Sequence, residues 1–308
     1  MKKILHAALL VMLAISFSVV DASAASKDKY KPFVLASKRA GEIAATVADV
    51  SAKLTAAGLE IVGTYSPYPT ATILIVTNDE MKKAAAKSDR GGFGAAQRVS
   101  ITDHKGEIQV AYTNPYYMAA AYRMEGNLDF AAKALEGALG KTREYGMSGG
   151  MSDSDLRDYH YMFGMEYFTD PHYLSRFANH ADAVAAVEKG LAAGTSGISK
   201  VFRIDIPGKD EVLFGIAMNG TKGAGDQQDD KFLMSEIDFK DIRSTAHLPY
   251  EMLVTNNRVY SLSARFRIAI SFPDLAMMGD NSFMNIMDSP NTIKAALTSV
   301  AGDVWVKQ

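Results

Sequence analysis

The densest group of side chains able to do chemistry lies between residues 158 and 173. The segment reads Asp-Tyr-His-Tyr-Met-Phe-Gly-Met-Glu-Tyr, and Asp-Pro-His-Tyr follows it closely. Tyrosine, histidine and methionine side chains combine apolar surface with a few polar atoms, as ligand pockets do. We therefore expect this segment to line a groove for a small ligand. The candidate ligand-binding residues are Tyr159, His160, Tyr161, Met165, Tyr167 and His172.

The same segment suggests a transition-metal site as an alternative. Imidazole and thioether ligands suit copper, which makes His160, Met165 and His172 the metal candidates. The spacing is unspecific, because neither His-x-x-x-His nor Glu-x-x-His occurs there. Met284 and Met287 have a spacing that copper-binding segments use, but methionines also serve as adaptable core filler. No cofactor is assigned, and an aromatic clamp between two domains is the favoured structural reading.

An enzyme is the weakest of the three function classes. Residues 146–150 match the Gly-x-Ser-x-Gly pattern around Ser148, but that motif has meaning only between a strand and a helix, and here a helix is expected before it. A pair such as His160 and Asp170 would need to meet in a cleft. No catalytic residue is assigned.

The N-terminal residues predict export. Lys2 and Lys3 precede an apolar run over residues 4–20 and the small residues Ala22-Ser23-Ala24, which is the layout of a signal peptide cleaved after Ala24. A periplasmic location follows, with no membrane span after cleavage. The chain has no cysteine, which excludes disulfides and thiolate metal sites, and its formal net charge of −2 gives no electrostatic case for nucleic acid.

These residues must be positioned by elements that follow the same order twice. The first half predicts a helix, two strands, a short helix capped by Asn78 or Asp79, and a hairpin that Asn114-Pro115 ends, with helices to residue 139. The ranges of the first helix and the four strands are 37–57, 59–65, 71–77, 98–102 and 107–113.

The second half predicts a helix from Asn179 or His180, two strands, a mixed segment and a long hairpin, which Phe272-Pro273-Asp274 ends. The strands are 199–206, 211–218, 250–255 and 259–271, the mixed segment is 232–242, and the closing helix is 292–300. On this reading Arg265 and Arg267 lie on a strand. Both leading helices end in Ala-Ala-Gly, at Gly58 and Gly194.

The expected fold is therefore α+β, with two related units, each a twisted antiparallel sheet with helices packed on one face. The first unit covers residues 25–140, the aromatic connector 141–178, and the second unit 179–308.

The second half resembles the bacterial domain-of-unknown-function family 302. The similarity lies in His247-Leu248-Pro249-Tyr250 and the following strand, turn and strand to Leu262. Residues 57–60 and 106–115 resemble the family more weakly, and Ala95-Ala96 stands where Leu-Pro is expected. The resemblance implies a fold similar to the TATA-binding protein, and dimers. It implies no activity and no catalytic residues.

Taken together, the sequence predicts a non-catalytic exported module that binds a small molecule or another periplasmic protein between its two units. It would act as a monomer with an internal pseudo-dimer, or as a homodimer. Copper binding and a hydrolase-type enzyme are the alternatives.

Overall fold

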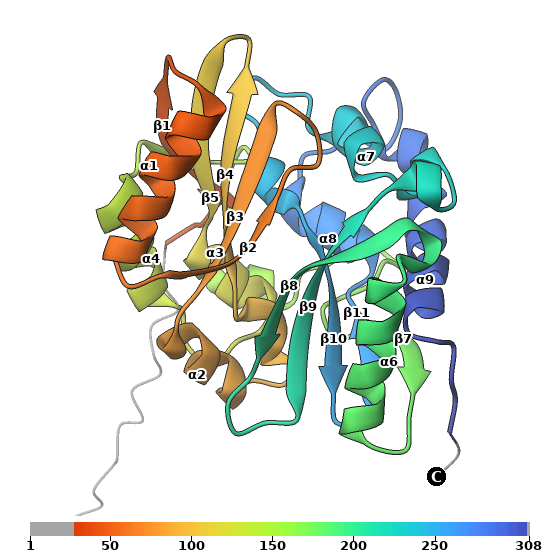
Figure 1. Cartoon of the computed structure of the whole chain (residues 1–308). Helices are drawn as coiled ribbons and strands as arrows, with labels where there is room; N and C mark the ends of the chain where they lie inside the picture. The colour runs from red at the N-terminus through yellow and green to blue at the C-terminus, as the bar shows by residue number, and fades with distance from the viewer. Residues whose placement is uncertain (1–27, 307–308) are drawn as a thin grey trace, which may run out of the picture.

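The computed structural model describes residues 28–306, so the predicted signal peptide lies outside the described residues. The first unit forms a six-stranded antiparallel sheet in the order β2-β3-β4-β5-β1-β6 (Figure 1). Its elements are β1 (Phe33–Arg39), α1 (Ile43–Ala56), β2 (Glu60–Tyr65), β3 (Ala71–Thr77), α2 (Asp79–Lys87), η1 (Gly91–Gly94), β4 (Gln97–His104), β5 (Glu107–Thr113), α3 (Pro115–Ala121), α4 (Asp129–Leu139) and β6 (Arg143–Tyr145).

The second unit forms a five-stranded antiparallel sheet in the order β8-β9-β10-β11-β7. A short helix, α5 (Asp153–Arg157), precedes it. Its elements are β7 (His172–Arg176), α6 (His180–Ala192), η2 (Thr195–Gly197), β8 (Ile198–Asp205), β9 (Glu211–Met218), η3 (Gly220–Lys222), η4 (Asp226–Gln228), α7 (Asp230–Ile237), η5 (Thr245–His247), β10 (Tyr250–Thr255), β11 (Arg258–Ser261), α8 (Ala264–Ser271), η6 (Phe283–Ile286) and α9 (Ser289–Val300).

The two units have the same topology, because β2-β3-β4-β5-β1 and β8-β9-β10-β11-β7 are the same strand order. Helices α1 and α4 cover the outer face of the first sheet, and α6 and α9 cover that of the second (Figure 1). The α+β fold with two related units is confirmed. One continuous hydrophobic core includes side chains of both units, such as Leu54 and Ile75 in the first and Val187 and Leu253 in the second.

Two sequence-based element assignments were wrong. The first helix begins at Ile43 rather than Ser37, because residues 33–39 form β1, whose first residues are buried. The last hairpin strand ends at Ser261, and residues 264–271 form α8, which Ser263 caps. Nearly every residue of α8 is buried, so its sequence lacks the alternation of polar and apolar faces that marks a helix.

Two arginines therefore lie on a different element from the one that the sequence predicts. Arg265 and Arg267 lie on α8 and not on a strand. The second hairpin ends at Ser263-Ala264 and not at Phe272-Pro273-Asp274. Ser263 is the equivalent of Asn114, because each residue caps the helix that follows its hairpin. The connector 141–178 also supplies strands to both sheets, as β6 and β7.

Each unit sends one segment onto the sheet of the other. We name residues 88–96, with η1, the first crossover, and residues 238–249, with η5, the second crossover. In the first, the Gly92 N–H donates to Glu211 Oε1 at the start of β9, at 2.6 Å. In the second, the hydroxyls of Thr102 on β4 and Thr245 lie 3.0 Å apart.

Equivalent residues meet where the crossovers end. Arg98 is the second residue of β4, and Glu251 is the second residue of the equivalent strand β10. Their partners on the neighbouring strands, Ile75 on β3 and Gly215 on β9, are equivalent as well. The side chains of Arg98 and Glu251 are buried and form an ion pair. Arg267 Nη1 donates to the other carboxylate oxygen of Glu251 at 2.6 Å. This charged cluster joins the units at the centre of the core.

Candidate ligand-binding site

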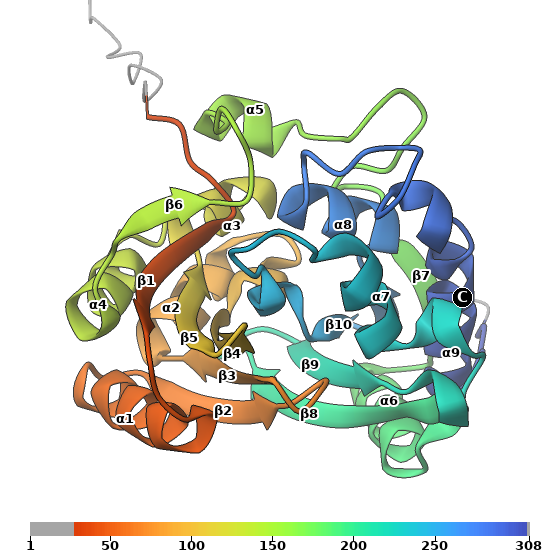
Figure 2. The ribbon, with the colours of Figure 1, turned by 90° about the horizontal axis from the view of Figure 1, so that it is seen from above.

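The second crossover separates two cavities at the junction of the units. Figure 2 shows the crossover near the centre of the molecule, between the first sheet and α8. Cavity 1 has a volume of about 570 Å³ and cavity 2 of about 460 Å³. Asp238 and Phe239 line both cavities. Phe239 keeps 43% of its surface exposed, which is unusual for a phenylalanine between two packed units.

Both units supply the walls of cavity 1. The first unit contributes Lys31 and the stretch 143–148, and the second contributes residues 237–242, Ser244 and residues just after α8. Its apolar side chains are Tyr145, Met147, Ile237, Phe239, Ile242, Phe272 and Leu275. Such a cavity falls in the range of about 300–1,000 Å³ typical of small-molecule sites.

Most charged side chains around cavity 1 have a partner within the protein, but one does not. Glu144 accepts from the Lys31 N–H at 3.0 Å and from Lys141 at 2.8 Å. Asp274 accepts from the Ser148 N–H at 2.8 Å, and Asp241 pairs with Lys105. Among the described residues, by contrast, the guanidinium of Arg143 has no hydrogen-bond or ion-pair partner. The charge that the lining leaves free for a ligand is therefore the exposed guanidinium of Arg143.

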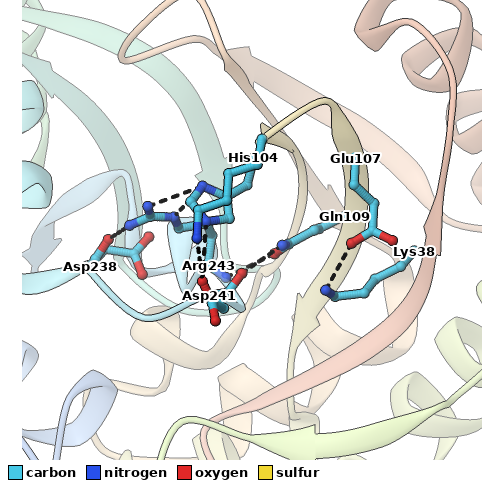
Figure 3. A network of polar contacts seen from close by, with 8 residues as sticks. Lys38, His104, Glu107, Gln109, Asp238, Asp241 and Arg243 are labelled. Atoms are coloured by element: carbon cyan, nitrogen blue, oxygen red, sulfur yellow. Dashed lines mark hydrogen bonds and ion pairs between the residues drawn. The ribbon is translucent and has the colours of Figure 1, made fainter.

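A polar network holds the second crossover against the β4–β5 hairpin (Figure 3). Gln109 on β5 donates to the carbonyl oxygen of Asp241 at 2.7 Å and accepts from the Arg243 N–H at 2.9 Å. Arg243 Nε and Nη2 lie 3.2 and 3.1 Å from His104 Nδ1, and Arg243 Nη1 donates to the carbonyl oxygen of Asp238. The hairpin thus fixes the loop through both its backbone and its arginine.

Burial and the contact with the Arg243 guanidinium determine the protonation state and the tautomer of His104. Burial, with Arg243 and Lys105 nearby, lowers the pKa of His104 from its ordinary value, and Asp241 opposes the shift only in part. A neutral imidazole whose Nδ1 accepts from Arg243 carries its proton on Nε2, which lies 3.6 Å from Asp241 Oδ1. Arg243 therefore has a neutral partner, and no carboxylate forms an ion pair with it among residues 28–306.

Asp238 is the titratable group shared by the two cavities. Its Oδ1 accepts from the Ser244 N–H at 2.8 Å, which closes the loop from residue 238 to 244. Burial raises the pKa of Asp238 to about 7, although the Ser244 N–H, Arg243 and Thr245 each favour the charged form. The site therefore contains a carboxyl that changes charge near neutral pH.

Helix α7 leads into this loop and is anchored at its start. Asp229 caps it by accepting from the N–H groups of residues 231 and 232. Asp230 accepts from Tyr65 Oη at 2.6 Å, across the junction of the units, and from the Met218 N–H at 2.9 Å. Burial raises the pKa of Asp230 to about 7 as well. Buried carboxyls therefore lie at both ends of α7.

The predicted connector residues lie elsewhere, against the second unit. Tyr161 donates to the carbonyl oxygen of Leu275 at 2.7 Å, and Tyr159 lies 3.4 Å from that of Ala269. Tyr161 and Met165 line a hollow of about 10 Å³ on α8. That volume holds about one water molecule. The tyrosines thus fasten the connector to α8.

The remaining predicted residues form two separate pairs. His160 packs on Tyr167 with ring centroids 4.3 Å apart. His172 Nε2 lies 3.8 Å from Glu166 Oε1, which also pairs with Arg265 at 3.0 Å. The proposed groove through these six residues stays a prediction.

The metal and enzyme alternatives, whose candidate residues lie on the connector, stay predictions. No group of three or more His, Asp or Glu side chains is placed to hold a metal ion in residues 28–306. Ser148 is exposed on the loop after β6, and no histidine lines the cavity beside it. Asp170 accepts from the Tyr167 N–H, which closes a turn.

Sequence reasoning missed the residues that line the cavities, among them Arg143, Lys231, Asp238, Phe239 and Arg243. One signal was present. Residues 238–243 place four charged side chains around Phe239 and Ile242 just after a helix, a composition that fits neither a buried strand nor a typical polar loop.

No family model, curated protein or solved structure matches this chain. Among residues 28–306, no helix is both long enough and apolar enough to cross a bilayer.

Proposed function

We propose that this protein binds a small organic anion in cavity 1, and that it does so without catalysis. The observation that carries the proposal is the cavity itself, about 570 Å³ in volume, with walls from both units. Its apolar side chains suit the body of an organic ligand, and Arg143 at its rim suits a carboxylate or sulfonate. The carboxylates around it are engaged by protein donors, which leaves positive charge for the ligand.

The proposed place of action is the periplasm. Its support is the basic start, apolar run and small-residue cleavage site of residues 1–24. The relation to domain-of-unknown-function family 302 is likewise a proposal, supported by residues 247–262 and their weaker counterpart in the first half. Neither proposal is needed for the binding experiment.

The experiment uses 8-anilinonaphthalene-1-sulfonate, a fluorescent probe with an apolar body and one sulfonate. We expect saturable binding at one site by the folded protein. Phe239→Ala removes apolar surface that faces the cavity, and Arg143→Gln removes the free charge. Each should weaken binding by about tenfold, since losing either contact removes about 1–2 kcal/mol.

The matched control is Phe163→Ala, because Phe163 is fully exposed on the connector, away from the cavities. It should leave binding unchanged. Both phenylalanines have substantial exposure, so neither variant should unfold the chain. Equal binding by the wild type and the Phe239→Ala variant, or equal loss in the Phe163→Ala variant, would exclude cavity 1 as the probe's site.

A further inference from the structure

Cavity 2 differs from cavity 1 in its chemistry. Its volume is about 460 Å³, and its lining contains the cationic residues Lys231 and Arg243, which come from the start of α7 and from the second crossover. Tyr68, Thr70 and Thr102 of the first unit belong to the same lining, as do the apolar residues Pro69, Met234 and Phe239. The cavity therefore has both polar and apolar walls, and both units supply them.

The two cations lack carboxylate partners. Within residues 28–306, Lys231 Nζ has no hydrogen-bond or ion-pair partner, and Arg243 is bonded to a neutral imidazole and a backbone carbonyl. The acidic side chains of the lining are engaged instead. Asp103 accepts from the Gly106 N–H at 3.0 Å, and Asp238 accepts from the Ser244 N–H.

We infer that cavity 2 is a second binding site, for a small oxyanion held between Lys231 and Arg243. Both residues line cavity 2, although the exposed Lys231 also lines a neighbouring cavity of about 440 Å³. Guanidinium and ammonium groups are the usual donors to carboxylate, sulfate and phosphate oxygens. Arg243 uses three of its five N–H groups within the protein, so two are available for an anion. His104 orients the guanidinium through Nδ1.

Anion binding should take up a proton near neutral pH. Asp238 lines the same cavity, and burial raises its pKa to about 7. The groups that face its carboxyl are the Ser244 N–H, the Thr245 hydroxyl and Arg243 on its own segment, with Tyr68 and Tyr145 from the first unit. A bound anion disfavours the charged carboxylate, which raises its pKa further. Binding should therefore strengthen as pH falls through 7.

The test is titration of the purified protein with sulfate by isothermal calorimetry, with chloride at matched ionic strength as the reference. Sulfate keeps its charge across this pH range, so proton uptake reports the protein alone. We expect one saturable site and a Kd about tenfold weaker in Lys231→Gln, which loses one charge-assisted hydrogen bond. The matched control is Lys87→Gln, an exposed lysine at the end of α2 that lines neither cavity 1 nor cavity 2.

Two further readouts distinguish this site from cavity 1. Sulfate should leave the affinity for 8-anilinonaphthalene-1-sulfonate nearly unchanged, and Asp238→Asn should abolish proton uptake while sulfate still binds. The inference is overturned if sulfate does not bind, if Lys87→Gln weakens binding as much as Lys231→Gln, or if sulfate displaces the fluorescent probe competitively. Because the two probes use separate sites, failure of either site leaves the other testable.

Discussion

The two crossovers occupy equivalent places in the two units, yet one is closed and the other is open. The first is packed so tightly that Gly91, Gly92, Phe93 and Gly94 are all buried. The second is longer, with charged side chains along it and a cavity on each side. The comparison teaches that the duplicated scaffold can be held together by one crossover while the other is available for binding.

The largest effect is expected where both crossovers end. Glu251→Leu leaves the buried guanidiniums of Arg98 and Arg267 without their carboxylate. Uncompensated buried charge of this kind costs about 3–5 kcal/mol. We expect the free energy of unfolding, measured with urea, to fall by that amount.

The control for this change is a pair at the surface. Arg203→Gln breaks contacts with Asp205 and Glu188, which are solvent-exposed, and should cost about 0–1 kcal/mol. A similar loss in both variants would show that the central cluster does not join the units.

The next effect concerns the open crossover and has a definite sign with pH. Asp238 has a native pKa of about 7, above its unfolded value of 3.8, so the native state holds a proton that the unfolded state releases between these pH values. Stability should therefore fall as pH rises from about 4 to about 7. A shift of about three pKa units corresponds to about 4 kcal/mol, so Asp238→Asn should remove about 3–4 kcal/mol of the fall, and Asp230 accounts for a further part.

Urea unfolding at pH 5 and pH 8 measures this difference. The control is Asp241→Asn, because Lys105 holds the pKa of the exposed Asp241 below its ordinary value, so Asp241 stays charged throughout that range. The assignment to Asp238 would be refuted by a variant whose stability changes with pH as much as that of the wild type.

The sequence predicted the parts of the fold that local patterns determine. Strands 60–65 and 71–77, the caps Asn78 and Asn179 and the stop at Asn114-Pro115 agree with the structure. It missed β1 and β7, the equivalent first strands of the two units. Both find their hydrogen-bond partners far along the chain, so local periodicity carries little information about them.

The cavities lay beyond the reach of local patterns for the same reason. Cavity 1 is built from Lys31, residues 143–148, residues 237–244 and residues 272–275, which only the tertiary fold brings together. The connector attracted attention through composition alone, and its tyrosines bond to backbone carbonyls near α8. The second crossover, a charged loop that attracted no attention, forms a wall of both cavities.

The smallest effect tests the closed crossover. In Gly92→Ala the new Cβ would lie 2.5 Å from Leu253 Cδ1 and 2.9 Å from Glu211 Oε1. The crossover must shift, which strains its hydrogen bond to Glu211, and overpacking of this size costs about 1–2 kcal/mol.

The control, Gly137→Ala on α4, has no atom near the new Cβ and should instead add about 0.5–1 kcal/mol to the free energy of unfolding through helix propensity. Because Gly92 lies far from the cavity linings, Gly92→Ala should lower stability without changing the affinity for 8-anilinonaphthalene-1-sulfonate. A loss of affinity would mean that the closed crossover also shapes the open one, and the two could no longer be assigned separate roles.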